Sequence, residues 1–170
     1  VSLAIGSATG GSWRIPASYC GITGYEPSHG LVPLTGTCPL SFSFDTIGPL
    51  GNSVACCAAA HAIMADDLVA PVTPRTPGTL RLAMLKDFVL DGLEPVVEQS
   101  FQRALKRLGQ AGAGLSDLAF PELKGIPAIN AKGGIVAAEA FQHHRARMAA
   151  EGQAYDPRVR NRIEMAEGIL

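Results

Sequence analysis

The residues best suited to do chemistry lie in one short block, residues 6–17, which reads GSATGGSWRIPA. At its centre two glycines, Gly10 and Gly11, are followed by Ser12. Consecutive glycines adopt backbone angles that are closed to other residues, so successive N–H groups can point into one concavity that binds an anion. A serine hydroxyl beside such donors suits acyl transfer, because attack on a carbonyl places negative charge on its oxygen.

Two other interpretations of this block stay open on the residues alone. Gly-Gly-Ser is common in ordinary loops, so the turn can be purely structural. A phosphate-binding loop is the other alternative, but the block lacks the Gly-Lys-Ser/Thr ending that supplies a lysine and a metal-binding hydroxyl. It also does not open a long helix as a dinucleotide-binding GxGxxG motif does, because Pro16 interrupts it too early.

A serine nucleophile needs a base, and the chain offers no clear one. A triad of Ser12, His29 and Asp45 can be written down, although His29 sits in a turn. A lysine serves only when burial or neighbouring cations keep it neutral. Four lysines are present and none is assigned this role: Lys86, Lys106, Lys124 and Lys132.

Three side chains near Ser12 have both a structural and a functional interpretation. Arg14 is expected to pair with Asp45 or with backbone carbonyls, and binding of a substrate carboxylate is the alternative. Asp45 starts a turn and is interpreted as structural. Trp13 either lines an acyl pocket or packs in the core.

The elements around the block must position it. Residues 3–6 (LAIG) are expected to form a short buried strand that leads into it. Residues 6–53 are expected to form ordered turns and short extended pieces. Residues 53–65 (SVACCAAAHAIMA) predict a buried helix with Asn52 or Ser53 as its N-cap.

The second half of the chain predicts alternating strands and helices. Residues 80–86 and 114–120 are expected to be strands, and residues 94–110 form a clear amphipathic helix between them. Strand, helix and strand in this order indicate a crossover unit within a parallel or mixed sheet. Residues 134–151 and 157–168 predict two further helices. The predicted fold class is therefore α/β.

Charge is distributed unevenly along the 170 residues. Of 14 basic and 15 acidic side chains, only Arg14, Glu26 and Asp45 lie in residues 1–65, so this segment must be interior or must pack against something absent from this chain. We expect residues 1–65 to be the core segment and residues 66–170 the strand–helix–strand and helical segment of a single domain. The net charge of −1 argues against a nucleic-acid groove.

Two further observations concern the cellular setting. The longest weakly polar run, residues 54–65, is too short to span a bilayer. The four cysteines have neither a disulfide framework nor zinc spacing, so they are expected to be buried reduced thiols of a cytoplasmic protein: Cys20, Cys38, Cys56 and Cys57.

The block at residues 6–17 resembles the core of the amidase signature family. The resemblance continues in register through residues 19–30 (YCGITGYEPSHG), 39–50 (PLSFSFDTIGPL) and 53–55 (SVA), and more loosely through residues 88–93, 139–141 and 155–159. It therefore extends over nearly the whole chain. It implies a mixed β-sheet core flanked by helices, of which this chain forms an incomplete part.

The resemblance also implies a function, namely hydrolysis of a carboxylic amide through a seryl acyl-enzyme. Ser12 corresponds to the nucleophile, and the backbone N–H groups of Thr9, Gly10, Gly11 and Ser12 to the oxyanion hole. In that family the base is a lysine acting through a second serine beside a cis peptide bond, and both lie upstream of this block. No cofactor and no metal are expected. The expected partner is a small-molecule amide, without nucleic acid or membrane and with a homodimer left open.

We therefore expect the chain to be an internal piece of a longer amidase, inactive by itself. It opens with Val1 rather than Met, its first 65 residues are nearly uncharged, and the family's base is missing. Its partners would then include the missing N- and C-terminal parts of the same protein.

Departures from the family pattern leave two alternatives open. Ala8, Glu26, Leu31 and Cys56 stand where other residue types are common. One alternative is the amidase component of a tRNA-dependent amidotransferase, although such proteins usually carry glutamine before the proline, where this chain has Ile15. The other is a non-catalytic amidase-like scaffold.

Overall fold

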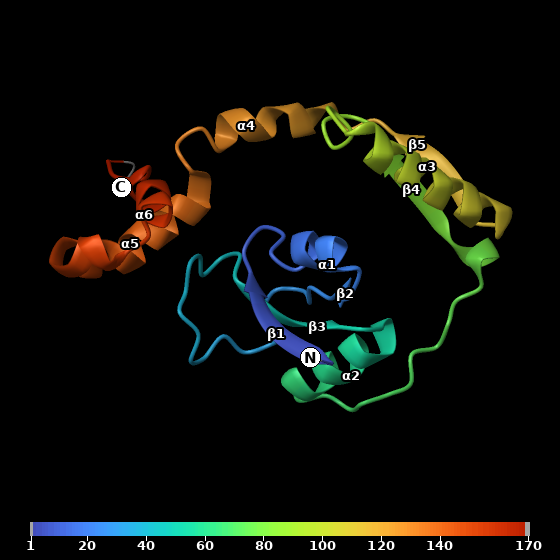
Figure 1. Cartoon of the computed structure of the whole chain (residues 1–170), viewed down its shortest axis with the longest axis horizontal. Helices are drawn as coiled ribbons and strands as arrows, with labels where there is room; N and C mark the ends of the chain where they lie inside the picture. The colour runs from blue at the N-terminus through green and yellow to red at the C-terminus, as the bar shows by residue number, and fades with distance from the viewer. Residues whose placement is uncertain (1, 169–170) are drawn as a thin grey trace. The chain divides into compact units, whose positions relative to one another are not determined.

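The computed structural model describes residues 2–168, which divide into two compact units. The first unit contains the described residues up to Val72 together with those from Asn130 onward. The second contains Thr73–Ile129. Figure 1 labels the helices and strands of both units in chain order. Among residues 2–168, no helix has the length and apolar character needed to cross a membrane.

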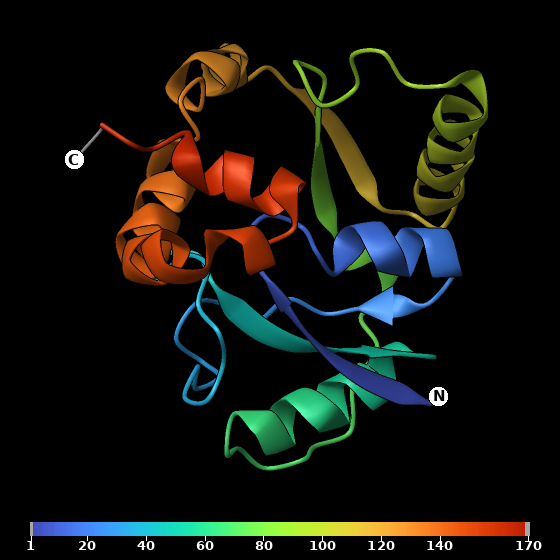
Figure 2. The ribbon, with the colours of Figure 1, turned by 60° about the vertical axis from the view of Figure 1, so that its left-hand side comes forward.

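The first unit is built on a three-stranded antiparallel sheet (Figures 1 and 2). Strands β1 (Leu3–Ala8) and β2 (Thr23–Gly24) both pair with β3 (Thr46–Gly51), which gives the strand order β1-β3-β2. In the register of β1 and β3, Ala8 lies opposite Thr46. β3 is therefore the central strand, and its residues are buried or half-buried throughout.

Two helices flank this sheet. Helix α1 (Arg14–Cys20) lies on one side of it and α2 (Val54–Met64) on the other (Figures 1 and 2). The Ser53 side chain accepts a hydrogen bond from the N–H of Cys56 at 3.2 Å, which identifies Ser53 as the N-cap of α2. Helix α1 was not predicted, because its seven residues include Pro16 and are too few to show a helical pattern.

Trp13 anchors the segment between β1 and α1. Its side chain is fully buried, and its indole N–H donates to the carbonyl oxygen of Gly48 at 3.1 Å. A Cβ atom at Gly48 would overlap the backbone carbonyl oxygen of Tyr25, so the close approach of these two backbone segments requires glycine. Trp13 thus packs in the core, which was one of its two sequence interpretations.

The remaining helices of the first unit form a pair. Helix α5 (Gly134–Glu151) and helix α6 (Pro157–Glu164) are joined through the short 3₁₀ turn η3 (Gly152–Ala154). They pack together, and their buried side chains are Ala137, Ala140, His144 and Ile163. The helix at 134–151 has the predicted bounds, whereas the one at 157–168 ends earlier, at Glu164.

The second unit contains the predicted crossover. Strands β4 (Arg81–Leu85) and β5 (Gly114–Leu118) are parallel, and helix α3 (Pro95–Gln110) connects them. This arrangement confirms the prediction of a strand, a helix and a parallel strand. The unit also contains two 3₁₀ turns and a short helix: η1 (Pro77–Thr79), η2 (Pro121–Gly125) and α4 (Ile126–Ile129).

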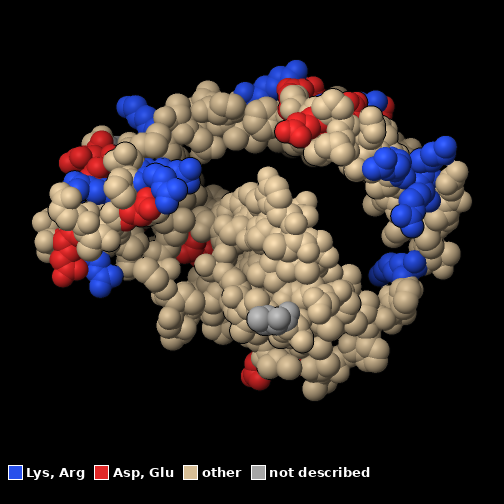
Figure 3. Space-filling model, viewed as in Figure 1, with Lys and Arg blue, Asp and Glu red and all other residues tan. Residues whose placement is uncertain are grey.

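The apolar first segment is less buried than its composition predicted. Strand β1 was expected to be buried, yet Leu3 is 41% and Ile5 66% exposed. β1 lies at the edge of its sheet, where few neighbours cover its side chains. Helix α2 was also expected to be buried, but Ile63 is 71% exposed. On the face in Figure 3 this segment is almost free of charge, and most charged side chains lie on the later elements.

All four cysteines are free, as predicted, but only one of them is buried. Burial raises the pKa of the Cys57 thiol, so that thiol stays protonated. The prediction of burial is wrong for the other three because they lie on exposed parts of α1, of the loop before β3 and of α2: Cys20, Cys38 and Cys56.

Candidate active site

Ser12 lies in the turn that connects β1 to α1, and it is exposed. Trp13, which follows it, is fixed in the core, and Gly11, which precedes it, has a φ of 126°. Few residues other than glycine adopt this backbone angle. The carbonyl oxygen of Gly11 accepts a hydrogen bond from the N–H of Ile15 at 3.1 Å. The turn is therefore ordered on both sides of the serine.

The backbone amides of residues 9–12 take no part in the sheet or in α1. The pairing of β1 with β3 ends at Ala8, one residue before Thr9. Within residues 2–168, none of the N–H groups of residues 9–12 donates to a backbone carbonyl oxygen. Four amides in succession beside an exposed hydroxyl are the donors that a developing oxyanion needs.

Asp45 holds the start of the turn from the neighbouring loop. The Thr9 hydroxyl donates to Asp45 Oδ1 at 2.6 Å, and Asp45 Oδ2 accepts from the N–H groups of Leu40 and Ser41 at 2.7 and 3.0 Å. Asp45 is only 7% exposed. Its structural role was predicted, whereas its bond to Thr9 was not.

The partner predicted for Arg14 is wrong. Its guanidinium pairs with Glu26 at 3.3 Å, while Asp45 is occupied by Thr9 and two backbone amides. The reason is geometric, since Asp45 faces the start of the turn and Arg14 lies beyond its end, on α1. The Arg14 side chain is 70% exposed, so this ion pair adds little to stability.

Within residues 2–168, neither His29 nor Asp45 forms a hydrogen bond with Ser12. The His29 ring bonds to the carbonyl oxygen of Phe42 at 3.0 Å, and Asp45 bonds to Thr9. The triad of Ser12, His29 and Asp45 is therefore not assembled. Two of the four lysines are in ion pairs of the second unit, Lys86 with Asp117 at 2.5 Å and Lys124 with Asp87 at 3.4 Å. No group of three or more metal-ligating side chains gathers in residues 2–168.

A set of contacts from helix α5 to the loop that carries Asp45 was not predicted. Glu139 accepts hydrogen bonds from the hydroxyls of Ser41 and Ser43 and from the N–H of Ser43. His144 bonds to the carbonyl oxygen of Pro39 at 3.1 Å. The only sequence signal was the loose family resemblance of residues 139–141.

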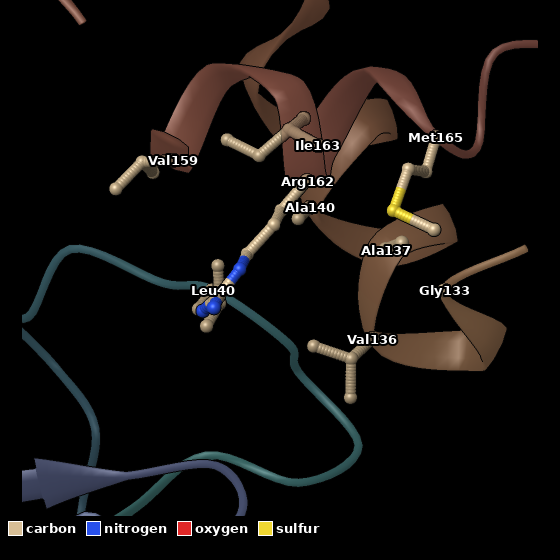
Figure 4. Close-up of a pocket in the computed structure, with 9 residues that line it drawn as sticks. All are labelled: Leu40, Gly133, Val136, Ala137, Ala140, Val159, Arg162, Ile163 and Met165. Carbon is tan, nitrogen blue, oxygen red and sulfur yellow. The ribbon is translucent and has the colours of Figure 1, made fainter. Parts of the chain in front are cut away.

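A cavity of about 420 Å³ lies where α5 and α6 meet Leu40 (Figure 4). Its lining is mostly apolar, and the Arg162 side chain extends from α6 toward Leu40. None of residues 9–12 lines this cavity. The serine turn is therefore a separate site on the surface of the first unit.

The sheet, its flanking helices and the serine turn define an α/β protein of the amidase type. The chain belongs to the Amidase family, whose sequence model matches residues 1–167. A crystal structure of an amidase superposes with a TM-score of 0.83 at 28% identity, over 98% of this chain and 37% of that one.

The chain is also similar in sequence to two proteins of different function. It is 35% identical over 142 residues to a glutamyl-tRNA(Gln) amidotransferase subunit from Trichormus variabilis, covering 74% of this chain and 29% of that protein. It is 33% identical over 170 residues to the 2-amino-5-chloromuconic acid deaminase of Comamonas testosteroni, covering 98% of this chain and 37% of that protein. The chain thus spans about a third of the length of these relatives.

Proposed function

We propose that the complete protein hydrolyses a carboxylic amide and that Ser12 is its nucleophile. The observation that carries this proposal is the exposed Ser12 hydroxyl beside a run of backbone amides that donate to no backbone carbonyl within the described chain. Membership of the Amidase family gives independent support. The amidases to which the chain is similar include a peptide amidase from Stenotrophomonas maltophilia, whose structure matches with a TM-score of 0.64 at 27% identity.

The proposed reaction has two stages. The Ser12 Oγ attacks the amide carbon, and its proton passes to a bridging serine and a neutral lysine that come from outside this chain. The carbonyl oxygen becomes negative and accepts hydrogen bonds from the N–H groups of residues 9–12. The C–N bond breaks, the nitrogen leaves with the transferred proton, and water then hydrolyses the ester to release the acid. Loss of one oxyanion donor costs about 3–4 kcal/mol of transition-state stabilisation.

A fluorophosphonate probe tests the role of Ser12. In the complete protein, we expect Ser12→Ala to abolish labelling and to lower amide hydrolysis by about 10⁴-fold or more, because no other hydroxyl replaces the nucleophile. The matched control is Ser18→Ala, which removes an exposed hydroxyl from α1. Labelling that survives in Ser12→Ala, or a folded wild-type protein that never labels, would contradict the proposal. The second result would favour the scaffold alternative.

The amidase component of an amidotransferase is the second candidate, and the Trichormus variabilis relative favours it. The two candidates differ in what they need for activity. An independent amidase hydrolyses simple amides as a purified protein, whereas an amidotransferase component needs its partner subunits. We place this candidate second because the chain has Ile15 before Pro16, where amidotransferase components usually carry glutamine.

The remaining features of the proposal concern partners and setting. The substrate is a small-molecule amide, and the base system comes from parts of the protein outside this chain. We propose that the isolated chain of 170 residues is inactive because it lacks that base. The free cysteines fit the cytoplasm, where thiols are kept reduced.

A further inference from the structure

The loop of residues 39–45 forms hydrogen bonds both to helix α5 and to the serine turn. On the side of the turn, Asp45 binds the Thr9 hydroxyl with one oxygen and the N–H groups of Leu40 and Ser41 with the other. The position of Thr9 therefore depends on where the backbone at residues 40 and 41 lies.

On the other side, Glu139 of α5 binds the same loop, through the Ser41 hydroxyl and through the hydroxyl and N–H of Ser43. One carboxylate oxygen accepts from the Ser41 hydroxyl at 2.5 Å and from the Ser43 N–H at 3.0 Å, and the other accepts from the Ser43 hydroxyl. Ser41 is fully buried. One carboxylate thus receives three donors from a loop that is 96 to 98 residues away in the sequence.

These bonds also keep Glu139 charged. The hydroxyl of Ser41, followed by the hydroxyl and N–H of Ser43, holds the pKa of the Glu139 carboxyl below its ordinary value. At neutral pH the carboxylate therefore remains an acceptor for all three donors.

We propose that Glu139 is a positioning residue for the oxyanion turn. It fixes Ser41 and Ser43, the backbone at residues 40 and 41 then holds Asp45, and Asp45 holds Thr9. This inference rests on the proposed role of Ser12, because the amides that it positions are those that would bind the oxyanion. Glu139 touches no reacting atom and acts only through this series of hydrogen bonds.

Helix α5 has other contacts to the loop, so Glu139 can be changed without undocking the helix. His144 bonds to the carbonyl oxygen of Pro39 at 3.1 Å, and the same ring bonds to the Tyr155 hydroxyl at 2.9 Å. The rings of His143 and Phe42 meet edge to face at 5.6 Å. These contacts remain when the carboxylate is removed.

Steady-state kinetics of the complete protein test the inference with two substitutions at one position. Glu139→Ala loses all three hydrogen bonds, and we expect kcat to fall about tenfold while KM stays within about twofold. Glu139→Gln can keep all three, because the Ser43 hydroxyl can accept as well as donate, and we expect it to retain most of kcat. The control is Glu151→Ala, an exposed residue at the end of the same helix.

A double-substitution cycle separates positioning from general stability. Thr9→Val removes the hydroxyl that binds Asp45 but keeps the Thr9 amide. Because both residues act along one series of contacts, we expect Thr9→Val combined with Glu139→Ala to lower kcat no further than the stronger single change. A merely structural role of Glu139 would leave the two effects independent.

Three outcomes would overturn the inference. These are a kcat of Glu139→Ala no lower than that of Glu151→Ala, equal losses in Glu139→Ala and Glu139→Gln, or fully additive effects with Thr9→Val. If Glu139→Ala does not fold, Ser43→Ala decides: it removes one hydroxyl, and a kcat equal to wild type would contradict the inference. Failure of the proposed function is seen separately, as labelling that persists in Ser12→Ala.

Discussion

At the scale of single residues, Gly11 determines how Ser12 is presented. Its φ of 126° turns the chain from the end of β1 toward α1, and Ser12 stands exposed after it. Gly10, the neighbouring glycine, has no positive φ, and a Cβ atom there would meet nothing within 4 Å. The backbone therefore requires glycine at position 11 but not at position 10.

This difference gives a prediction for two matched substitutions. We expect Gly11→Ala to lower the free energy of unfolding by about 1–3 kcal/mol, because alanine is strained at that backbone angle. Gly10→Ala should change it by less than about 1 kcal/mol, since alanine fits there without strain. Thermal unfolding of the complete protein measures both. Equal effects of the two substitutions would show that the φ of Gly11 is not the constraint.

The sequence was informative about the residues of the turn but not about their long-range partners. The position of the serine turn between a strand and Pro16 followed from the local motif. The pairing of Arg14 with Glu26 instead of Asp45 could not be predicted from the sequence, because nothing local distinguishes the two carboxylates. The contact of Glu139 with Ser41 spans 98 residues, and no periodicity or spacing encodes such a contact.

At the scale of elements, the sequence predicted the longer helices α2, α3 and α5 with nearly their observed bounds. Helix α3 could be predicted because its apolar side chains recur on one face. Helix α1 has only seven residues, too few for such a pattern. The burial of β1 was overestimated because apolar composition does not indicate whether a strand lies at the edge of its sheet.

The cap of α2 allows a prediction at this scale. Ser53→Ala removes the acceptor for the Cys56 N–H, so we expect it to destabilise the protein by about 1 kcal/mol. Ser53→Asp should restore most of this loss, because aspartate is an equally good N-cap. Denaturant unfolding measures both variants, and a Ser53→Ala protein as stable as wild type would contradict the assignment of the cap.

At the scale of the whole molecule, two carboxylates link stability to pH. Hydrogen bonds from Ser41 and then Ser43 lower the pKa of Glu139, and those from Arg158 lower the pKa of Asp156, the N-cap of α6. A group whose pKa is lower in the folded state stabilises the fold above its unfolded pKa. This contribution is lost as the pH falls through the folded pKa.

We therefore expect the melting temperature to fall once the pH drops below about 4, near the ordinary carboxyl pKa. Glu139→Gln and Asp156→Asn do not titrate, so each should make this decrease shallower. Asp156→Asn keeps the oxygen that accepts from the Arg158 N–H, although it loses the bond from Arg158 Nη2. Glu151→Gln is the control and should follow the wild-type curve. Melting temperatures measured from pH 7 to pH 3 test this prediction. Parallel curves for the wild type and the three variants would contradict it.

The position of β1 at the edge of its sheet affects how this polypeptide associates when it is produced by itself. Within residues 2–168, β1 is paired on one side only, with β3. Its other side presents main-chain donors and acceptors flanked by Leu3 and Ile5, which are 41% and 66% exposed. Such an edge strand can pair with a further extended segment. When the polypeptide is produced by itself at high concentration, we expect that segment to come from another copy, so that multimers form.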